Sequence, residues 1–118
     1  MYKRQITSSP SFLYEKDTPW EDLGNGVSRQ VMGFNQDLMM VKFRFIPGAV
    51  GAPHHHVHSQ SAMVMSGVFE LTINGEKKIL SAGDGYFVEP GVEHSAVCIE
   101  EGILIDAFNP FRTDFLGN

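Results

Sequence analysis

Hydrophobic and polar residues alternate along short stretches of this chain, and turn residues separate these stretches. In residues 38–46, Val41, Phe43 and Phe45 would share one face of an extended strand, and the residues between them are polar. Alternation with a period of two is typical of a strand that buries one face and exposes the other. The pattern therefore predicts a half-buried sheet.

Turn residues predict where the neighbouring strands begin and end. Asn74-Gly75 readily adopts the positive φ angles of a tight hairpin turn, and glycine and proline at 82–85 and 90–91 mark further turns. The strands predicted between the turns are residues 68–73, 77–80, 86–88, 94–99 and 103–108, and residues 20–27, with a turn at 24–26, would begin the barrel. Many short strands without a long helical period predict an all-β chain, either a closed barrel or a jelly roll.

The length of the chain fits one compact domain. A chain of 118 residues can bury roughly two-thirds of its unfolded surface, which is enough for one stable core. No internal repeat divides it. Residues 1–18 are polar and contain Pro10, which predicts an N-terminal arm that is either loose or added as a strand to a neighbouring subunit. Residues 19–118 are predicted to form the single domain.

The net charge and the cysteine content indicate which binding partners and which cellular compartment the sequence favours. The net charge is -5 and no basic cluster is present, which argues against nucleic acid and anionic membranes as partners. Residues 1–16 contain no continuous apolar run, so neither a signal peptide nor a membrane span is predicted. The single Cys98 cannot form an internal disulfide, which fits a reducing cytoplasm. We therefore expect a soluble cytoplasmic protein.

The histidines are the most informative residues for function. They lie in two short blocks, His54, His55, His56 and His58 in the first and His94 in the second. If the first block is an extended strand, His54, His56, His58 and Gln60 share one face, and His94 would close the group from a distant strand. Imidazole nitrogens with an amide oxygen suit one divalent transition metal ion, which could be Ni, Zn, Mn, Fe, Co or Cu. The predicted ligands are His54, His56, Gln60 and His94.

The other two histidines are assigned different places. A run of three ligands along one strand would crowd the ion, so His58 is expected to line the pocket or support a ligand, and His55 to point outward or pack. Two alternatives remain at this stage. Either the histidines are polar surface residues, or they persist from an ancestral site that no longer binds an ion.

A carboxylate in the last predicted strand is the best candidate for proton transfer. Leu104, Asp106 and Phe108 share a face of residues 103–108, and an unpaired buried carboxylate is costly. Facing the barrel interior, Asp106 would lie near the metal with a raised pKa. Arg112 could bind an anionic group through its planar fork. The alternatives are an Asp106 bonded to loop backbone, a solvated Arg112, and a Phe108 that only fills the core.

The two histidine blocks resemble the two motifs of the cupin superfamily. The matching residues are Gly48, His54, His56, Gln60 and Gly67 in the first motif, and Gly83, Pro90, Gly91 and His94 in the second. Gln60 stands where the superfamily usually has Glu, Glu89 where it has Pro, and Cys98 where it has Asn. The resemblance implies a jelly roll with the metal inside the barrel. A neutral Gln60 would leave the ion its full positive charge and strengthen its pull on anionic or hydroxyl-bearing substrates.

From Trp20 to its end the chain resembles a narrower family, the small pectin-degradation cupins of the KdgF type. The similar segments are residues 20–27, 37–41, 74–77, 90–94 and 106–112. This resemblance implies a metal held by His54, His56, Gln60 and His94, with Asp106, Phe108 and Arg112 as catalytic residues. The sequence departs from the family at His55, Val57, Ser59 and residues 61–63, which border the pocket and bear on substrate choice.

The narrower resemblance implies a reaction and an assembly. The substrates would be 4,5-unsaturated monouronates from pectin or alginate breakdown, and the products linear 4-deoxy-5-keto-uronates, formed by ring opening and ketonisation in an isomerase-type reaction. A homodimer is expected because cupins commonly pair through their sheets. The alternatives are a metal-dependent cupin dioxygenase and a non-catalytic sugar-binding cupin. Gln60 argues against an iron site of two histidines and one carboxylate, but a three-histidine iron site stays open.

Overall fold

The computed structural model describes residues 6–117. Its helices are two short 3-10 turns, η1 (Glu15–Asp17) and η2 (Thr113–Leu116), and neither is long or apolar enough to cross a membrane. Its strands are β1 (Glu21–Gly24), β2 (Val27–Phe34), β3 (Met39–Phe45), β4 (Val50–His54), β5 (Ser59–Ile73), β6 (Glu76–Ser81), β7 (Gly85–Val88) and β8 (His94–Asn109). All the strand pairs of the described chain are antiparallel. The prediction of an all-β chain is confirmed.

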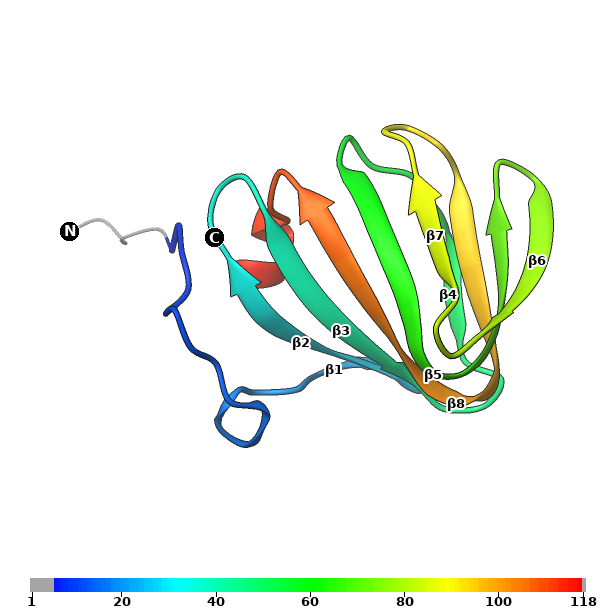
Figure 1. The fold of residues 1–118 in the computed structure, drawn as a ribbon, viewed down its shortest axis with the longest axis horizontal. Coiled ribbons are helices and arrows are strands. Elements are labelled where there is room, and N and C mark those ends of the chain that lie inside the picture. The colour runs from blue at the N-terminus through cyan, green and yellow to red at the C-terminus, as the bar shows by residue number, and fades with distance from the viewer. Residues whose placement is uncertain (1–5, 118) are drawn as a thin grey trace.

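Two long strands connect the two halves of the barrel. β5 and β8 pair with each other along most of their lengths (Figure 1). In one half the strand order is β1-β2-β3-β8-β5-β7, and in the other it is β4-β8-β5-β6. Each long strand therefore contributes its first part to one half and its last part to the other, which is the arrangement of a jelly roll.

Two glycines allow β5 and β8 to bend together. The register between these strands shifts between Val64 and Phe69. A Cβ on Gly102 would run into the carbonyl oxygen of Ser66, and a Cβ on Gly67 would lie 2.5 Å from the carbonyl oxygen of Glu101. Because no side chain fits at this point, the two backbones approach closely while both strands continue.

Two of the predicted strand boundaries are wrong because the strands continue through this bend. The predicted strands 94–99 and 103–108 are one strand, β8, and the predicted strand 68–73 is the second part of β5, which begins at Ser59. The alternation read from the sequence is correct within each part. Leu104, Asp106 and Phe108 are buried, and the outward residues between them are only half-buried.

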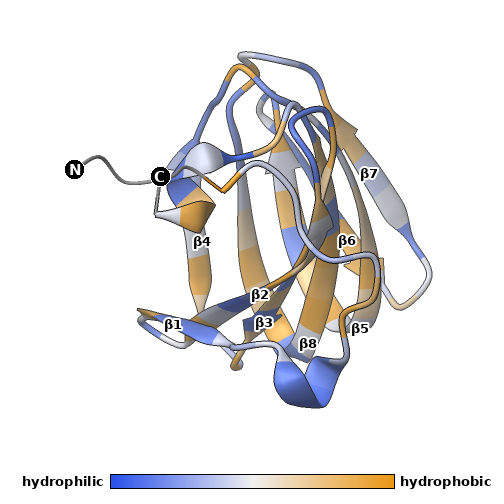
Figure 2. Ribbon diagram, turned by 90° about the vertical axis from the view of Figure 1, so that its left-hand side faces the viewer, coloured by the Kyte–Doolittle hydropathy of each residue, from blue (hydrophilic) through white to orange (hydrophobic). Residues whose placement is uncertain are grey.

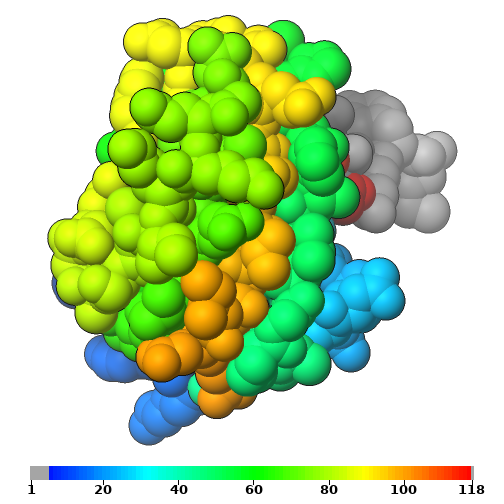
Figure 3. All heavy atoms as spheres, turned by 90° about the vertical axis from the view of Figure 1, so that its right-hand side faces the viewer, coloured from blue at the N-terminus to red at the C-terminus, as the bar shows by residue number. Residues whose placement is uncertain are grey.

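The core lies between the two halves of the barrel. One buried cluster comes from strands of both halves and consists of Phe45, Ala49, Val64, Phe69, Leu71, Ala96, Cys98 and Leu104. A smaller one, Met39, Val41 and Phe108, is covered by the C-terminal segment. Hydrophobic and hydrophilic bands alternate along the strands in Figure 2. Figure 3 shows the face of the half that β4, β8, β5 and β6 form in this order.

The described part of the N-terminal arm packs on β2 of its own chain. The buried Gln30 donates from Nε2 to the carbonyl oxygens of Glu15 (3.0 Å) and Thr18 (2.9 Å). The backbone nitrogen of Ser9 donates to the carbonyl oxygen of Phe34 (2.9 Å). Residues 6–20 contain no strand. Residues 1–5 of the predicted arm lie outside the described residues, and strand exchange with a neighbouring subunit stays a prediction.

We predict that Gly102→Ala destabilises the fold. The added Cβ would press on the backbone of β5, and overpacking of this kind costs about 1–3 kcal/mol. Gly51→Ala is the control, because its nearest neighbours would lie at 3.6 Å or more, and we expect a change of at most about 0.5 kcal/mol. Urea unfolding followed by circular dichroism measures both variants. Equal stability of the two would contradict the role given to Gly102.

Candidate metal centre

Three imidazoles converge where β4 meets β8. His54 ends β4 and pairs in register with His94, the first residue of β8, and His56 lies in the loop that follows β4. One ligand atom from each of the three side chains can be chosen so that all lie within 4.8 Å of one another. The ring centroids of His54 and His94 are 4.2 Å apart, and those of His56 and His94 are 4.9 Å apart.

The histidines meet by a different route from the one predicted. A single extended strand over residues 54–60 is wrong, because β4 ends at His54 and β5 begins only at Ser59. The chain leaves one half of the barrel here and enters the other. The loop is held by the backbone nitrogen of Gly91, which donates to the carbonyl oxygen of His56 at 2.7 Å. His56 therefore reaches the cluster from this loop.

Backbone carbonyls fix which nitrogen of each ring is free. Nδ1 of His54 is 2.9 Å from the carbonyl oxygen of Ala52, and Nδ1 of His94 is 2.9 Å from that of Val92. Nδ1 of His56 makes the same kind of contact, at 3.1 Å, with the carbonyl oxygen of His58. A carbonyl oxygen only accepts, so each Nδ1 carries the proton and each Nε2 keeps a lone pair, as a metal ligand requires.

The free nitrogens and Gln60 fit a cation. Nε2 of His94 is buried and has no hydrogen-bond partner in the described part of the chain. Nε2 of His56 lies 3.0 Å from Oε1 of Gln60, so two acceptors face each other. A cation between them would satisfy both. Burial also lowers the pKa of His56 and of His94, which favours the neutral rings that bind metals. The three histidines can hold a metal ion, and Gln60 is placed to join them.

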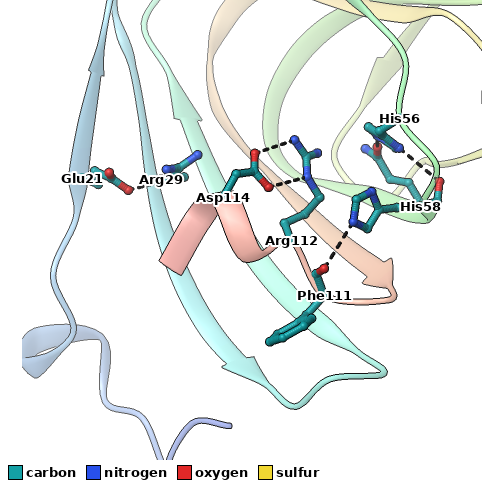
Figure 4. Close-up of polar contacts among 8 residues, drawn as sticks. Glu21, Arg29, His56, His58, Phe111, Arg112 and Asp114 are labelled. Atoms are coloured by element: carbon teal, nitrogen blue, oxygen red, sulfur yellow. Dashed lines mark hydrogen bonds and ion pairs between the residues drawn. The ribbon is translucent and has the colours of Figure 1, made fainter. Parts of the chain in front are cut away.

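The two remaining histidines lie outside this cluster. His55 is exposed, as one of its two predicted positions requires. His58 is turned toward the C-terminal segment, where Nε2 lies 3.2 Å from the carbonyl oxygen of Phe111 (Figure 4). Its ring also lies edge-on to Phe108, with the centroids 6.3 Å apart. His58 therefore links the loop that carries His56 to the end of the chain.

Asp106 is buried on the inner face of β8. It pairs in register with Ala62, which pairs in turn with Tyr86 of β7. Burial raises the pKa of Asp106 to about 7, and hydrogen bonds with Gln60 and Tyr86 limit the rise. Oδ1 of Asp106 is buried and has no hydrogen-bond partner within residues 6–117, so it can accept a hydrogen bond from a ligand.

Arg112 is largely buried beside Phe108. Its side chain is 15% exposed, and its guanidinium carbon lies 5.4 Å from the centre of the Phe108 ring and 4.4 Å from that of Phe115. Nε and Nη2 donate to the two carboxylate oxygens of Asp114, at 3.1 and 3.0 Å (Figure 4). The alternative of a solvated surface charge does not fit this position.

These groups surround one cavity of about 340 Å³, a size typical of small-molecule sites. The predicted site residues that line it are His54, Gln60, His94, Asp106, Phe108 and Arg112. The lining residues that were not predicted from the sequence include Arg29, Tyr86 and Phe115. Arg29 was detectable, because it shares a strand face with Val27 and Val31. A charge in an apolar row is the same signal that identified Asp106.

Residues 41–106 match the model of the Cupin domain family. The chain belongs to the cupin family. It is 47% identical to the Pectin degradation protein KdgF of Dickeya dadantii strain 3937 over 107 residues, which are 89% of this chain and 97% of that protein. It is thus a homologue of KdgF with the cupin fold and a possible three-histidine metal site.

Two solved structures superpose closely on this cupin. An RmlC-like cupin from Shewanella frigidimarina NCIMB 400 has a TM-score of 0.92 and 47% identity, with 93% of this chain and 99% of that chain covered. KdgF from Halomonas sp. has a TM-score of 0.87 and 38% identity, with 91% and 99% covered. The predicted cupin jelly roll is confirmed.

We predict that His54→Ala removes the metal from the purified protein. His54 is exposed, so the variant should fold, yet it loses one of three converging imidazoles. Elemental analysis should give close to one divalent ion per chain for the unmodified protein and a small fraction of that for the variant. His55→Ala is the matched control, since His55 is an exposed neighbour outside the cluster. Equal metal content in both variants would exclude this centre.

Proposed function

We propose that this cupin is a metal-dependent enzyme that opens and ketonises 4,5-unsaturated monouronates from pectin or alginate breakdown, giving linear 4-deoxy-5-keto-uronates. The observation that carries the proposal is the buried Oδ1 of Asp106, which has no hydrogen-bond partner among the described residues and lies in the cavity that His54, His94 and Arg112 also line. The relationship to the Pectin degradation protein KdgF supports the choice of substrate class.

The reaction needs one group that both accepts and returns a proton. Ring opening removes the proton of the anomeric hydroxyl, forms the C1 aldehyde and breaks the bond between C1 and the ring oxygen. The ring oxygen then carries the charge of an enolate at C5, and return of the same proton to C4 gives the 5-keto product. No atom is gained or lost overall, so the reaction is an isomerisation.

Asp106 is placed to move the proton. Its Oδ1 has no hydrogen-bond partner among the described residues and can accept the anomeric proton, then return it to C4, first as general base and then as general acid. Tyr86 and Gln60, which limit the rise of its pKa, are proposed to orient the carboxyl group. A divalent ion held by His54, His56, Gln60 and His94 would supply Lewis-acid stabilisation of the oxygen on which negative charge develops.

Two further residues would hold the sugar. Arg112 is proposed to bind the C6 carboxylate, because a guanidinium pairs with a carboxylate through parallel hydrogen bonds. Phe108 is proposed to pack on a face of the sugar, since its ring lines the cavity between His56, 5.8 Å away, and Arg112. The ligand would then lie between the histidine cluster and the arginine.

We infer further that the protein acts as a homodimer in the cytoplasm, with the small uronate as its ligand. An apolar strip on the outer side of β5 and β7 supports the dimer, since Met63, Met65 and Phe87 are 45%, 49% and 52% exposed. The single Cys98 fits a reducing compartment.

We predict that the metal-loaded protein accelerates the loss of ultraviolet absorbance from the C4=C5 enol of unsaturated galacturonate or mannuronate. The rate should exceed the spontaneous one and fall to it after treatment with a chelator, because the proposed chemistry needs the ion. No acceleration by protein of measured metal content would refute the uronate assignment. Oxygen uptake is recorded in parallel, and uptake that matches turnover would favour the dioxygenase alternative.

We predict that Asp106→Asn lowers turnover by about 100-fold or more, because the amide cannot take up the anomeric proton. Metal content and melting temperature should stay close to those of the unmodified protein. Asp37→Asn, an exposed change in the loop before β3, is the control and should leave turnover unchanged. Turnover in Asp106→Asn equal to that of the control would remove Asp106 from the mechanism.

A further inference from the structure

A second arginine, Arg29, faces the interior of the barrel from β2. It pairs in register with Phe43, which pairs with Leu104 of β8, so it belongs to an inner, apolar row. Its side chain is 12% exposed and lines the same cavity as Arg112 and Asp106. A buried guanidinium is costly without acceptors for its protons, so its contacts indicate its role.

Within the described chain, the Arg29 guanidinium is hydrogen-bonded along one edge only. Nε of Arg29 donates to Oε1 of Glu21 at 2.8 Å, across the β1–β2 pair (Figure 4). The guanidinium carbon lies 4.0 Å from the centre of the Phe115 ring. An arginine has five N–H donors, and this bond is the only one that the Arg29 side chain makes among the described residues. The Nη donors therefore stay available to a ligand.

Arg112 has the same arrangement on the same ring. Its guanidinium carbon lies 4.4 Å from the centre of Phe115, and its Nε edge is held by Asp114. Both supporting carboxylates are on the outside, since the side chains of Glu21 and Asp114 are 55% and 61% exposed. Two largely buried cations thus share one aromatic ring, and each is fixed from its solvent side.

The charges of Arg29 and Arg112 both act on the carboxylate of Asp114. Burial acts to raise the pKa of Asp114, but the hydrogen bond and charge of Arg112, with a smaller effect of Arg29, hold that pKa below its usual value. Two cations that pack on one ring repel each other in a low-dielectric pocket, and an anion bound to both relieves the repulsion. A carboxylate matches the planar guanidinium fork through two parallel hydrogen bonds.

We propose that Arg29 and Arg112 form a two-arginine clamp for the carboxylate of a sugar acid, at the end of the cavity beyond Phe108 from the histidine cluster. The ring of Phe108 lies 5.8 Å from that of His56 and 5.8 Å from that of Phe115, which separates the two ends. This inference rests on the proposed function and extends it, because it makes Arg29 a residue that selects acidic sugars over neutral ones.

The test is a comparison of D-galacturonate with D-galactose as non-reacting ligands of the metal-loaded protein, measured by calorimetry. We expect Arg29→Gln to weaken galacturonate binding about tenfold or more, the usual effect of losing a charged hydrogen-bond donor, and to leave galactose binding unchanged. Arg29→Lys keeps the charge and should recover part of the loss. Arg44→Gln removes the same charge from the exposed face of β3 and should match the unmodified protein.

Kinetics give a second readout. Arg29→Gln should raise KM for the unsaturated uronate about tenfold and change kcat by less than about threefold, because the clamp holds ground state and transition state alike. Unchanged galacturonate affinity, or equal losses for both sugars, would overturn the clamp. If Arg29→Gln does not fold, Arg29→Lys carries the test, and full galacturonate affinity in it would overturn the planar-fork argument.

The experiments distinguish a failure of the proposed clamp from a failure of the proposed reaction. The binding comparison needs no turnover, so charge-dependent galacturonate binding without ketonisation would keep the clamp and refute the reaction. Ketonisation by an unmodified protein that binds the two sugars equally would keep the reaction and refute the clamp.

Discussion

The site depends on one strand, β8, that crosses both halves of the barrel. Its even-numbered side chains face inward in each half, and the exposed Glu100 lies at the bend between them. β8 begins with His94 at the histidine cluster and carries Asp106 and Phe108 near its other end. The alternation survives the bend because Gly102 lets the backbones of β5 and β8 touch without a side chain between them. A bend with a bulky residue would have to push the strands apart, and the metal-binding and proton-transfer groups would no longer face one cavity.

Backbone carbonyls then determine which nitrogen of each histidine ring carries the proton. The Nδ1 atoms of His54, His56 and His94 are each engaged by a carbonyl of a residue two positions away. These bonds are local, so they form wherever the loops take their native shape and need no other side chain. They leave three nitrogen lone pairs close together, and no donor among the residues that the structure describes satisfies them. A cation is the partner that this arrangement lacks, which is a physical reason for a metal site independent of any family resemblance.

The sequence predicted side-chain faces better than strand connections. The faces of Asp106 and Phe108 follow from alternation alone, a local property that survives in the fold. The division of β8 at Gly102 failed because glycine signals a turn in the sequence, and only contact with the backbone of β5 shows that it permits a continuous bend. Arg29 was missed because no strand was assigned to residues 28–34, although the same charge-in-an-apolar-row argument applies to it.

The C-terminal segment joins the two ends of the cavity into one unit. Phe115 lies against Phe108 and beneath both arginine guanidiniums, and the carbonyl oxygen of Phe111 meets His58 in the loop that carries His56. The loop of the histidine cluster and the arginine end are therefore connected through a few contacts of the last residues. A ligand that contacts both ends of the cavity would order both at once. The histidine cluster needs a cation and the arginine end needs an anion, so the charges of each end stay unbalanced until that group binds. Binding at one end and order at the other are thus expected to be coupled through this segment.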